Sequence, residues 1–509
     1  MVVGSDEVLS RSAWIRSLGL AASGGVCIAL TGSPLEWAIL GWLGPAALLG
    51  AVEPAPGRVW SAGRALCLGI VFGTVVNAIA LYWIVGLLQR FAGFPLLVAV
   101  PTAALLWVAQ GVSFGLAAAG CSALVRARSL PGWIALAAAL VVTGSLAPAL
   151  FPWRLAATQI GFVPWIQLAE LGGEPLLDAL LGIGSCAAAV AARDRRWLPA
   201  CVFSMALVLP FAYGVWRLPV VEAERRAAPI LRVGVVQPSV SIEEKYDLLR
   251  SASRLSTLHA MSADLEARGA ELVVWPETAY PYPWRRERAR DVRGRRALLG
   301  PTVRGPLLAG AITVDAAGRR YNSAVAVEAD GRIAGIADKV RLLAFGEYVP
   351  LWDWIPALQR RFARGLSPGH GPQVVTVAGR RLGVLNCYED ILPAVARETM
   401  RARPELLVNL TNDAWFGRST EPHLHQALAR LRAVETRRDL IRAVNTGVSS
   451  WTAATGRDER RTPTWTRASF VADARMLQGT TPWVRFGDLV TPALAALLLA
   501  APLTATRRA

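Results

Sequence analysis

The sequence predicts a protein of two parts, a membrane domain built from α-helices and an α/β domain outside the membrane. Of its 509 residues, 53% are hydrophobic and only 18% are charged, which is typical of membrane proteins. The apolar residues are concentrated in residues 1–220 and 487–509, whereas residues 221–486 have the composition of a soluble domain. In that middle segment β-rich runs alternate with helical patterns, which favours sheets covered by helices.

Eight uncharged runs predict eight transmembrane helices, because crossing a bilayer takes about 20 apolar residues. Seven of the runs lie in residues 1–220, and the eighth opens the segment 487–509, which ends in a cytoplasmic tail. The α/β domain is therefore predicted to be inserted before the last span. The runs cover residues 17–35, 37–52, 65–89, 94–125, 129–153, 175–192, 197–216 and 489–506.

The distribution of arginine predicts the orientation of these helices, because cytoplasmic loops are rich in positive charge. With the N-terminus in the cytoplasm, the loops on the opposite side carry only Arg90 and Arg154. This places residues 221–486 outside the cytoplasm. A cleaved signal peptide over 17–35 is the alternative, but Val26 is bulky where cleavage requires small residues. The cytoplasmic arginines are then Arg11, Arg16, Arg58, Arg64, Arg126, Arg128, Arg193, Arg195, Arg196, Arg507 and Arg508.

The net charge of +17 does not indicate a nucleic-acid-binding protein. The arginines are scattered, no nucleic-acid-binding motif is present, and half of the chain is expected to face lipid. One segment, "RRERARDVRGRR" at 285–296, concentrates seven arginines and is predicted to form a solvated helix. The alternative for this segment is a contact with anionic lipid head groups.

Runs rich in β-branched residues predict the strands of the α/β domain, and longer amphipathic patterns predict its helices. The predicted helices cover 244–268, 390–402 and 421–438. The predicted strands cover 231–236, 271–275, 306–312, 321–328, 373–377, 381–386, 405–410 and 440–445.

Three polar residues follow strands of this domain, at the positions where α/β folds collect their chemistry. Glu277 follows "LVVW", Lys339 follows "GIAD", and Cys387 follows "GVLN". Cys387 is the only cysteine in residues 221–486, so it has no disulfide partner there and is either an inert buried thiol or a reactive one. Lys339 is one of two lysines beside 52 arginines, which indicates a need for an ammonium group at that position.

These three residue types form a consistent set for acyl transfer. A thiol with its usual pKa of about 8.5 is mostly protonated at neutral pH, and a carboxylate can remove that proton. An ammonium group stabilises both the thiolate and the oxyanion that forms when a carbonyl is attacked. The chemistry requires neither a metal nor a cofactor. His423 and His425 are two apart on a predicted helix and face different ways, so we read them as polar surface or supporting residues and not as a metal site.

The three segments resemble the nitrilase (carbon–nitrogen hydrolase) superfamily, which uses a Glu, Lys and Cys triad on an αββα sandwich. The motifs "WPETAYP", "FGEYVP", "NCYED", "NLTNDAWFG" and "RAVNTGVSS" further resemble the periplasmic domain of apolipoprotein N-acyltransferases. In the apolar part, residues 82–95 and 151–173 resemble the helical region of that family. The resemblance covers nearly the whole chain. It implies eight spans with the nitrilase-like domain before the last.

The resemblance also implies a reaction and a role for each motif residue. Members of the family move an acyl chain from a membrane phospholipid to the α-amino group of a lipoprotein's N-terminal diacylglyceryl-cysteine. Cys387 resembles the nucleophile that becomes a thioester, Glu277 the general base, and Lys339 the cation that stabilises the oxyanion. Glu347 resembles a carboxylate that orients Lys339.

Four further residues are expected around the pocket. Tyr388 and Glu389 match the residues that follow the nucleophile and shape the pocket, with the Tyr388 N–H as an oxyanion donor. Trp415 resembles an aromatic residue that binds or changes conformation near the site. Tyr246 stands where the family usually has tryptophan, after a "VVQPSV" segment that usually reads more like Gln-Gly-Asn. This departure affects the expected substrate contacts near Tyr246 and not the triad.

The resemblance finally implies a location and partners. We expect a multi-pass monomer in the bacterial inner membrane, with the catalytic domain in the periplasm and no cofactor. Its partners would be a phospholipid acyl donor, a diacylglyceryl-modified lipoprotein and the bilayer. One alternative is a membrane-anchored amidase or nitrilase that hydrolyses a small amide with the same triad. A non-enzymatic scaffold is the other alternative, and the intact triad argues against it.

Overall fold

The computed structural model describes residues 10–32, 35–291, 294–344, 346–349 and 365–505. The chain forms two compact units. The first consists of Met1–Leu218 and Phe486–Ala509, and the second of Pro219–Arg485. Both Phe345 and Pro350 of the motif "FGEYVP" lie outside the described residues, as do Arg507 and Arg508.

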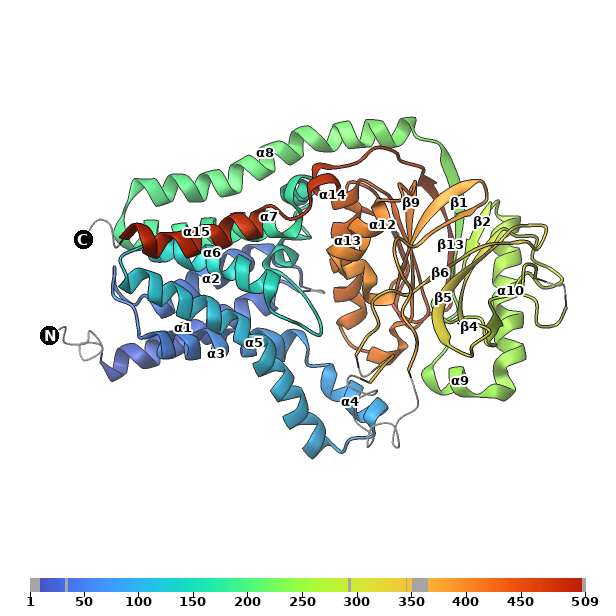
Figure 1. The fold of residues 1–509 in the computed structure, drawn as a ribbon, viewed down its shortest axis with the longest axis horizontal. Helices are drawn as coiled ribbons and strands as arrows, with labels where there is room; N and C mark the ends of the chain where they lie inside the picture. The colour runs from blue at the N-terminus through green and yellow to red at the C-terminus, as the bar shows by residue number, and fades with distance from the viewer. Residues whose placement is uncertain (1–9, 33–34, 292–293, 345, 350–364, 506–509) are drawn as a thin grey trace. The chain divides into compact units, whose positions relative to one another are not determined.

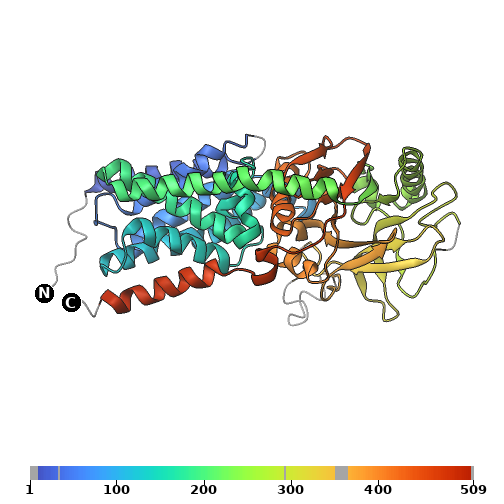
Figure 2. The same ribbon diagram turned by 90° about the horizontal axis from the view of Figure 1, so that it is seen from above.

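The first unit is built from helices that run alongside one another (Figures 1 and 2). The helix α3 packs along α5, where an added Cβ at Gly69 or Gly73 would clash with the α5 backbone. Small residues allow this close approach, as is common between helices in membranes. The helices are α1 (Arg11–Ala29), α2 (Ala38–Val52), α3 (Ala62–Ala80), α4 (Ile84–Ala92), α5 (Leu96–Arg126), α6 (Gly132–Leu146), α7 (Ala169–Asp194), α8 (Trp197–Ala227), which continues into the second unit, and α15 (Val490–Ala505), with the 3₁₀ helices η2 (Leu155–Gln159) and η3 (Trp165–Leu168).

Among the described residues, four helices are long and apolar enough to cross a membrane: Ala62–Ala80, Leu96–Arg126, Trp165–Asp194 and Trp197–Ala227. Ala38–Val52, Gly132–Leu146 and Val490–Leu503 are apolar but shorter. Two of the predicted spans are interrupted. The run 65–89 is divided between α3 and α4. The run 129–153 contains only the shorter α6, because Pro131 precedes this helix and Pro148 follows it, and proline limits a helix at both ends.

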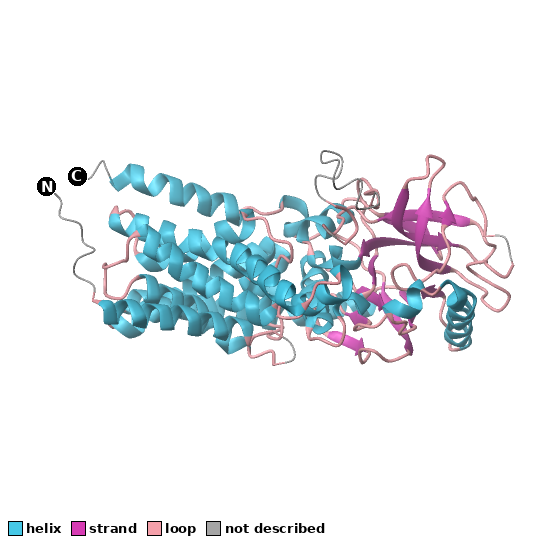
Figure 3. Ribbon diagram, turned by 90° about the horizontal axis from the view of Figure 1, so that it is seen from below, coloured by secondary structure: helices cyan, strands magenta, loops and turns pink. Residues whose placement is uncertain are grey.

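The second unit contains every strand that the described part of the chain forms (Figure 3), arranged in two sheets. The first sheet has the order β13-β1-β2-β4-β5-β6, with β3 beside β4, and the second has the order β12-β11-β10-β9-β8-β7. The strands of the first sheet are β1 (Ile230–Gln237), β2 (Leu272–Val274), β3 (Trp284–Arg285), β4 (Leu307–Val314), β5 (Arg320–Val327), β6 (Ile333–Asp338) and β13 (Ala468–Arg475). Those of the second are β7 (Val374–Val377), β8 (Arg380–Asn386), β9 (Leu406–Thr411), β10 (Leu440–Val444), β11 (Ser450–Thr452) and β12 (Asp458–Arg461).

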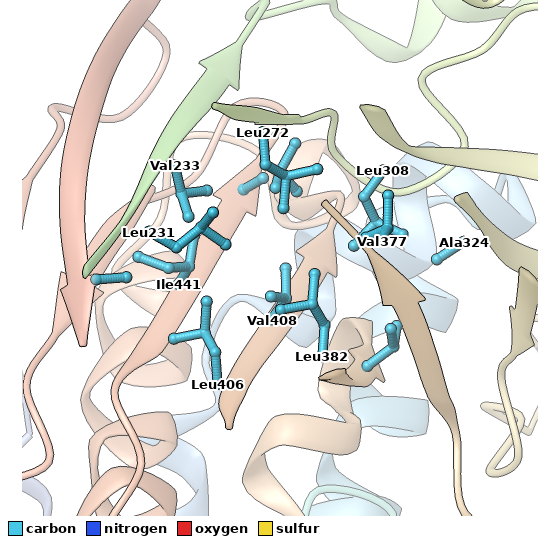
Figure 4. Close-up of a cluster of buried hydrophobic side chains, with 14 of the residues drawn as sticks. Leu231, Val233, Leu272, Leu308, Ala324, Val377, Leu382, Leu406, Val408 and Ile441 are labelled. Atoms are coloured by element: carbon cyan, nitrogen blue, oxygen red, sulfur yellow. The ribbon is translucent and has the colours of Figure 1, made fainter. Parts of the chain in front are cut away.

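The two sheets face each other across an apolar core (Figure 4). Leu231, Val233, Leu272 and Leu308 of the first sheet meet Leu382, Leu406, Val408 and Ile441 of the second. The helix α10 covers the outer face of the first sheet, and α12 and α13 cover that of the second. The predicted αββα sandwich is thereby confirmed. The helical elements are α9 (Ile242–Tyr246), η4 (Leu248–Arg250), α10 (Ser251–Ala267), η5 (Cys387–Ile391), α12 (Pro393–Met400), η6 (Asp413–Phe416), α13 (Glu421–Thr436) and α14 (Pro482–Phe486).

The pairing of the strands explains where the polar residues meet. The strands β8, β9 and β10 are parallel, as are β1, β2 and β4, so their carboxyl ends lie at one edge of each sheet. Buried on both faces, such strands read as continuous apolar runs, and β9 ("LLVNLT") is buried at every position. The segments after β2, β6 and β8 carry Glu277, Lys339 and Cys387 respectively.

Two of the predicted helices differ in the structure. The predicted helix 244–268 is broken, because the Asp247 side chain accepts a hydrogen bond from the Leu249 N–H and starts a separate 3₁₀ turn. The arginine-rich segment 285–296 forms no helix in its described residues. The buried Asp291 accepts hydrogen bonds from the Leu298 and Leu299 N–H groups and folds this segment back on itself.

Candidate active site

A buried ammonium group lies between two carboxylates at the sheet edges. The Lys339 Nζ is 2.9 Å from a Glu347 carboxylate oxygen and 3.5 Å from a Glu277 oxygen. The Lys339 side chain is only 2% exposed, and Glu277 is also buried. Burial alone would lower the pKa of Lys339, but the charge that Cys387 carries as a thiolate and the charges of Glu277 and Glu347 raise that pKa well above its usual value. Lys339 is therefore a permanent cation in this site.

Asn322 connects the two carboxylates from the neighbouring strand. Its side-chain N–H group donates to Glu277 at 2.6 Å and to Glu347 at 2.9 Å. The second Glu347 oxygen accepts from the Leu343 N–H at 2.8 Å and from Lys339. The two carboxylates are thus held on either side of one cation. Asn322 was not predicted as a site residue, although a polar amide inside the apolar run "YNSAVAVE" was a possible signal.

Cys387 occupies a strained turn directly after β8. Its backbone φ is 54°, in the left-handed region that residues with a side chain rarely adopt. Such a conformation costs about 1–3 kcal/mol and is maintained only by its surroundings. Here the Asn409 side chain donates to the Cys387 carbonyl at 2.8 Å and to the Leu385 carbonyl at 3.1 Å. The thiol itself is buried, with 8% of the residue exposed.

The surroundings of Cys387 keep its thiol protonated at rest. Burial raises the pKa of Cys387 well above its usual value, the charge of Glu277 raises it further, and Lys339 opposes both. A protonated thiol requires a base before it can attack a carbonyl. The Glu277 carboxylate, bonded to Asn322 and Lys339, is the group whose charge acts most strongly on this thiol.

Glu389 joins the turn of the nucleophile to the segment that follows Lys339. One carboxylate oxygen accepts from the Val340 and Arg341 N–H groups, both at 2.7 Å, and the other accepts from the Asn386 N–H at 2.9 Å. The side chain is fully buried, and burial raises its pKa to about 7 against the opposing effect of these hydrogen bonds. Glu389 therefore holds the segments that follow β6 and β8 relative to each other.

Three aromatic residues lie at or near this cluster. The Lys339 Nζ is 5.3 Å from the centre of the Tyr388 ring, and the Tyr388 hydroxyl donates to the Leu342 carbonyl at 3.2 Å. Tyr246 and Trp415 contact each other with ring centres 6.4 Å apart, and Tyr246 is 66% exposed. The predicted residues thus form two groups, one buried around Lys339 and one aromatic pair that reaches solvent.

Lys245, the second lysine of the chain, also faces the site. Its Nζ donates a short hydrogen bond to the Thr278 hydroxyl, next to Glu277 in the sequence. Burial lowers the pKa of Lys245 to about 8, while the charges of Glu277 and Cys387 raise it in part. The rarity of lysine, used above for Lys339, applies equally to this residue, but sequence reasoning assigned it no role.

A buried charge network links η5, which contains Cys387, to its surroundings. One His425 ring nitrogen is 2.9 Å from Asp390 and the other is 3.2 Å from Asp413, while Arg442 donates to Asp390 at 2.8 Å. Because both ring nitrogens face carboxylates, both must donate, and the ring is an imidazolium. Burial opposes this charge, but Asp390 and Asp413 raise the pKa of His425 to about 10. His425 thereby connects η5, which begins with Cys387, to η6.

Two expectations for this histidine can now be compared with its position. His425 is 3% exposed, so its interpretation as polar surface is wrong. Asp413, Glu421 and His425 place ligand atoms within 4.8 Å of one another, a spacing that a metal ion could use. However, both imidazole nitrogens already face carboxylates, so His425 has no free nitrogen to offer an ion in this arrangement.

Comparison with known proteins covers both units. A carbon–nitrogen hydrolase family model matches residues 232–477, and a model of the apolipoprotein N-acyltransferase N-terminal domain matches residues 24–187. The apolipoprotein N-acyltransferase of Geobacter metallireducens is 31% identical over 500 residues, covering 92% of this chain and 91% of the relative. The chain belongs to the apolipoprotein N-acyltransferase family. The family members from Gloeobacter violaceus and Azotobacter vinelandii are each 30% identical, over 97% and 96% of this chain and 95% of each relative.

Membership of the N-acyltransferase family makes this chain an enzyme of the carbon–nitrogen hydrolase superfamily with an acyl-transfer role. The apolar helices and the matching N-terminal domain make it a membrane protein. Of the predicted residues, the structure brings Glu277, Lys339, Glu347 and Tyr388 into direct contact around one cation. Glu389 contacts the backbone of this cluster, whereas Tyr246 and Trp415 form the separate pair.

Proposed function

We propose that this enzyme transfers an acyl chain from a membrane phospholipid to the N-terminal α-amino group of diacylglyceryl-cysteine lipoproteins, through a thioester on Cys387. The observation that carries this proposal is the buried Lys339 cation, held between Glu277 and Glu347 beside a buried, protonated thiol. Residues of these types at this spacing supply a base, a nucleophile and an oxyanion-stabilising charge.

In the first step Glu277 removes the thiol proton, and the Cys387 sulfur attacks the ester carbonyl of the phospholipid. The tetrahedral oxyanion forms next to Lys339, whose ammonium stabilises it more than it stabilises the uncharged ester. The intermediate then expels the lysophospholipid oxygen, which takes the proton from Glu277. The products are a thioester on Cys387 and a lysophospholipid.

In the second step the α-amino group of the acceptor, in its neutral form, attacks the thioester. Glu277 accepts a proton from the attacking nitrogen, and the intermediate collapses with the Cys387 sulfur as the leaving group. The sulfur is reprotonated through Glu277, and the product is an amide. The burial of Cys387 limits the access of water, which favours the amine over hydrolysis of the thioester.

The surrounding residues are proposed to position these groups. Glu347 orients Lys339 and keeps the ammonium from neutralising Glu277, while Glu389 fixes the turn of the nucleophile. Tyr388 packs beside the ammonium, and its N–H is the proposed second oxyanion donor. The pair of the exposed Tyr246 and the half-buried Trp415 is the proposed aromatic contact for substrate, with tyrosine at 246 in place of the tryptophan usual in the family.

The membrane arrangement supports this reaction. We propose that residues 1–220 and 487–509 form the membrane domain and that the catalytic domain, 221–486, is inserted before the last span. The eight proposed spans are α1, α2, α3, α5, α6, α7, α8 and α15. The helix α2 has 15 residues and spans about 22 Å, so residues that flank the shorter helices must complete their crossings. The arginine distribution supports a catalytic domain on the periplasmic side of the inner membrane.

Both proposed substrates are anchored in the bilayer by their acyl chains. Each buried CH₂ group contributes about 0.8 kcal/mol, so neither substrate leaves the membrane easily. Apolar helices precede and follow the catalytic domain in the sequence. The domain therefore meets both substrates at the membrane surface. No cofactor is needed for either step, and we propose that a monomer carries out both.

The test is a transfer assay with purified protein in micelles. A phospholipid with a labelled acyl chain is mixed with a peptide that carries diacylglyceryl-cysteine at its N-terminus. The proposal predicts an N-acylated peptide and an equal amount of lysophospholipid, and none of either with Cys387→Ala. Release of labelled free fatty acid without peptide acylation, or cleavage of small amides at a comparable rate, would instead favour the membrane-anchored amidase.

A further inference from the structure

The second unit contains a basic depression whose lining includes none of the proposed catalytic residues. Its volume is about 560 Å³. Four of its seven lining residues are arginines, and none carries a carboxylate. The lining residues are Arg397, Met400, Arg401, Arg403, Thr480, Val484 and Arg485, which we call the basic depression. They come from α12, from the turn that follows it, and from α14 with the residues before it.

The basic depression has an apolar floor and a charged rim. Met400 and Val484 are almost fully buried, 3% and 9% exposed. The Arg397 Nε donates to the Trp483 and Val484 carbonyls at 3.3 and 3.2 Å, which fixes this side chain against α14. A bound molecule would therefore contact both guanidinium groups and apolar carbon.

The charge on the rim is only partly compensated. Arg401 pairs with Glu398 at 2.6 Å. Within the described part of the chain, the guanidinium group of the exposed Arg403 makes neither an ion pair nor a hydrogen bond. Guanidinium groups bind phosphate oxygens through paired N–H donors more specifically than ammonium groups do. An excess of such groups around one hollow indicates a phosphate-bearing ligand.

The position of Arg485 in the sequence, shortly before an apolar helix, indicates a lipid head group as the source of this phosphate. Arg485 precedes the apolar helix α15 by five residues, since α15 begins at Val490. Five residues extend at most about 18 Å, so Arg485 lies within that distance of the start of α15. If α15 is the last span, as proposed above, Arg485 lies near the depth of the lipid head groups. Basic residues directly outside a span bind anionic lipid.

We propose that the basic depression binds the phosphate of an anionic phospholipid head group at the membrane surface. The arginines of the rim contact the phosphate, and the glycerol and first acyl carbons lie over Met400 and Val484. Glu277, Lys339 and Cys387 are not among the lining residues, so the proposed lipid occupies a site of its own and is not the molecule being attacked. The proposal rests on the membrane placement of α15 given under the proposed function. A zwitterionic head group binds less well, because the rim repels its cationic end.

The experiment measures lipid binding to the full-length protein and not acyl transfer. The Cys387→Ala protein in detergent is titrated with a short-chain phosphatidylglycerol, a short-chain phosphatidylcholine or inorganic phosphate, and bound lipid is counted by native mass spectrometry. We expect phosphatidylglycerol to bind with higher affinity than phosphatidylcholine. In the double variant Arg401→Gln/Arg403→Gln this affinity falls about tenfold or more, because each basic residue near an anionic head group strengthens binding severalfold. Both arginines are exposed, so the variant is expected to fold.

A matched control is the double variant Arg319→Gln/Arg332→Gln, which changes the net charge equally. The Arg319 side chain is 61% exposed and pairs with Asp315, as Arg401 is 61% exposed and pairs with Glu398. Equal loss of phosphatidylglycerol binding in both double variants would overturn the proposal in favour of general charge attraction. Saturation by inorganic phosphate with no lipid preference would overturn the lipid assignment. Peptide acylation by Arg401→Gln/Arg403→Gln is also measured at saturating donor. A normal rate would show that the proposed reaction does not depend on the proposed lipid site.

Discussion

Lys339 is closer to Glu347 than to Glu277, at 2.9 Å against 3.5 Å from the nearest carboxylate oxygens. Because its contact is shorter, Glu347 interacts more strongly with the ammonium group than Glu277 does. Glu277 is thus near enough to the cation to share its field, but its carboxylate is not consumed by the ion pair and remains available as a base. This difference, with Asn322 bonded to both carboxylates, supports the proposed roles of Glu347 in positioning and Glu277 in proton transfer.

Replacement of Glu347 by glutamine is expected to slow formation of the acyl-enzyme on the order of 10²-fold, the usual effect of misplacing a catalytic group by about 1 Å. Without the Glu347 charge, Lys339 moves to Glu277 and weakens it as a base. The rate is measured in a single turnover without acceptor. Glu347→Asp, which keeps the charge, should recover part of the rate. An unchanged rate in Glu347→Gln would show that Glu347 does not position Lys339.

Lys339→Arg is expected to lose activity by on the order of 10³-fold although the charge is retained. The guanidinium group is planar and larger than an ammonium group, and it cannot fit between Glu277 and Glu347 with the same hydrogen bonds. The measurement is peptide acylation at saturating substrates, with thermal unfolding as the control for folding. Substantial activity in this variant would remove the assigned role of Lys339.

Lys245 is expected to give the first step a pH dependence near pH 8. Its pKa is lowered to about 8, so its positive charge is complete well below pH 8 and is lost as the pH rises through that value. The positive charge favours the thiolate of Cys387, so the acylation rate should fall across this range. Lys245→Met should be slower below pH 8 and should lack this decrease. A decrease of the same size and midpoint in Lys245→Met would exclude Lys245 as its origin.

His425 is expected to stabilise the fold in a pH-dependent way. Its pKa in the folded protein is about 10, above its usual value of 6.5, so the stabilisation is complete below about pH 6.5 and is lost as the pH rises through 10. His425→Asn should lower the free energy of unfolding by roughly 3–5 kcal/mol at pH 6, as for a broken buried ion pair. The difference from the wild type, followed by denaturant unfolding, should shrink toward pH 10. His423→Asn on the same helix is the control, and a pH-independent difference for His425→Asn would contradict the imidazolium assignment.

The fold and the central triad followed from local patterns in the sequence. Glu277, Lys339 and Cys387 could be found because each follows an apolar strand, and parallel strands bring such ends together. The strands β3, β11, β12 and β13 were missed. Of these, β12 reads "DERR", which at an exposed sheet edge does not differ from a polar loop. A charged segment such as 285–296 likewise gave no sign that it folds around the buried Asp291.

The supporting residues could not be predicted in the same way, because each acts through partners far away in the sequence. Asn322 bonds to Glu277, 45 residues earlier, and to Glu347, 25 residues later. His425 bonds to Asp390, 35 residues earlier, and nothing in "EPHLHQ" shows that one of its two histidines is buried. Such contacts depend on how the helices and turns pack on the sheets, which periodicity alone does not determine.

The most direct measurement of the central claim is the mass of the enzyme after incubation with phospholipid in the absence of acceptor. Glu277 and Lys339 are proposed to make the Cys387 sulfur a nucleophile. The peptide that contains Cys387 should therefore gain the mass of one acyl chain. Addition of the diacylglyceryl-cysteine peptide should then remove that mass at the rate at which acylated peptide appears, and Glu277→Gln should prevent the gain. Steady transfer to the acceptor peptide while Cys387 never carries an acyl group would contradict the thioester account.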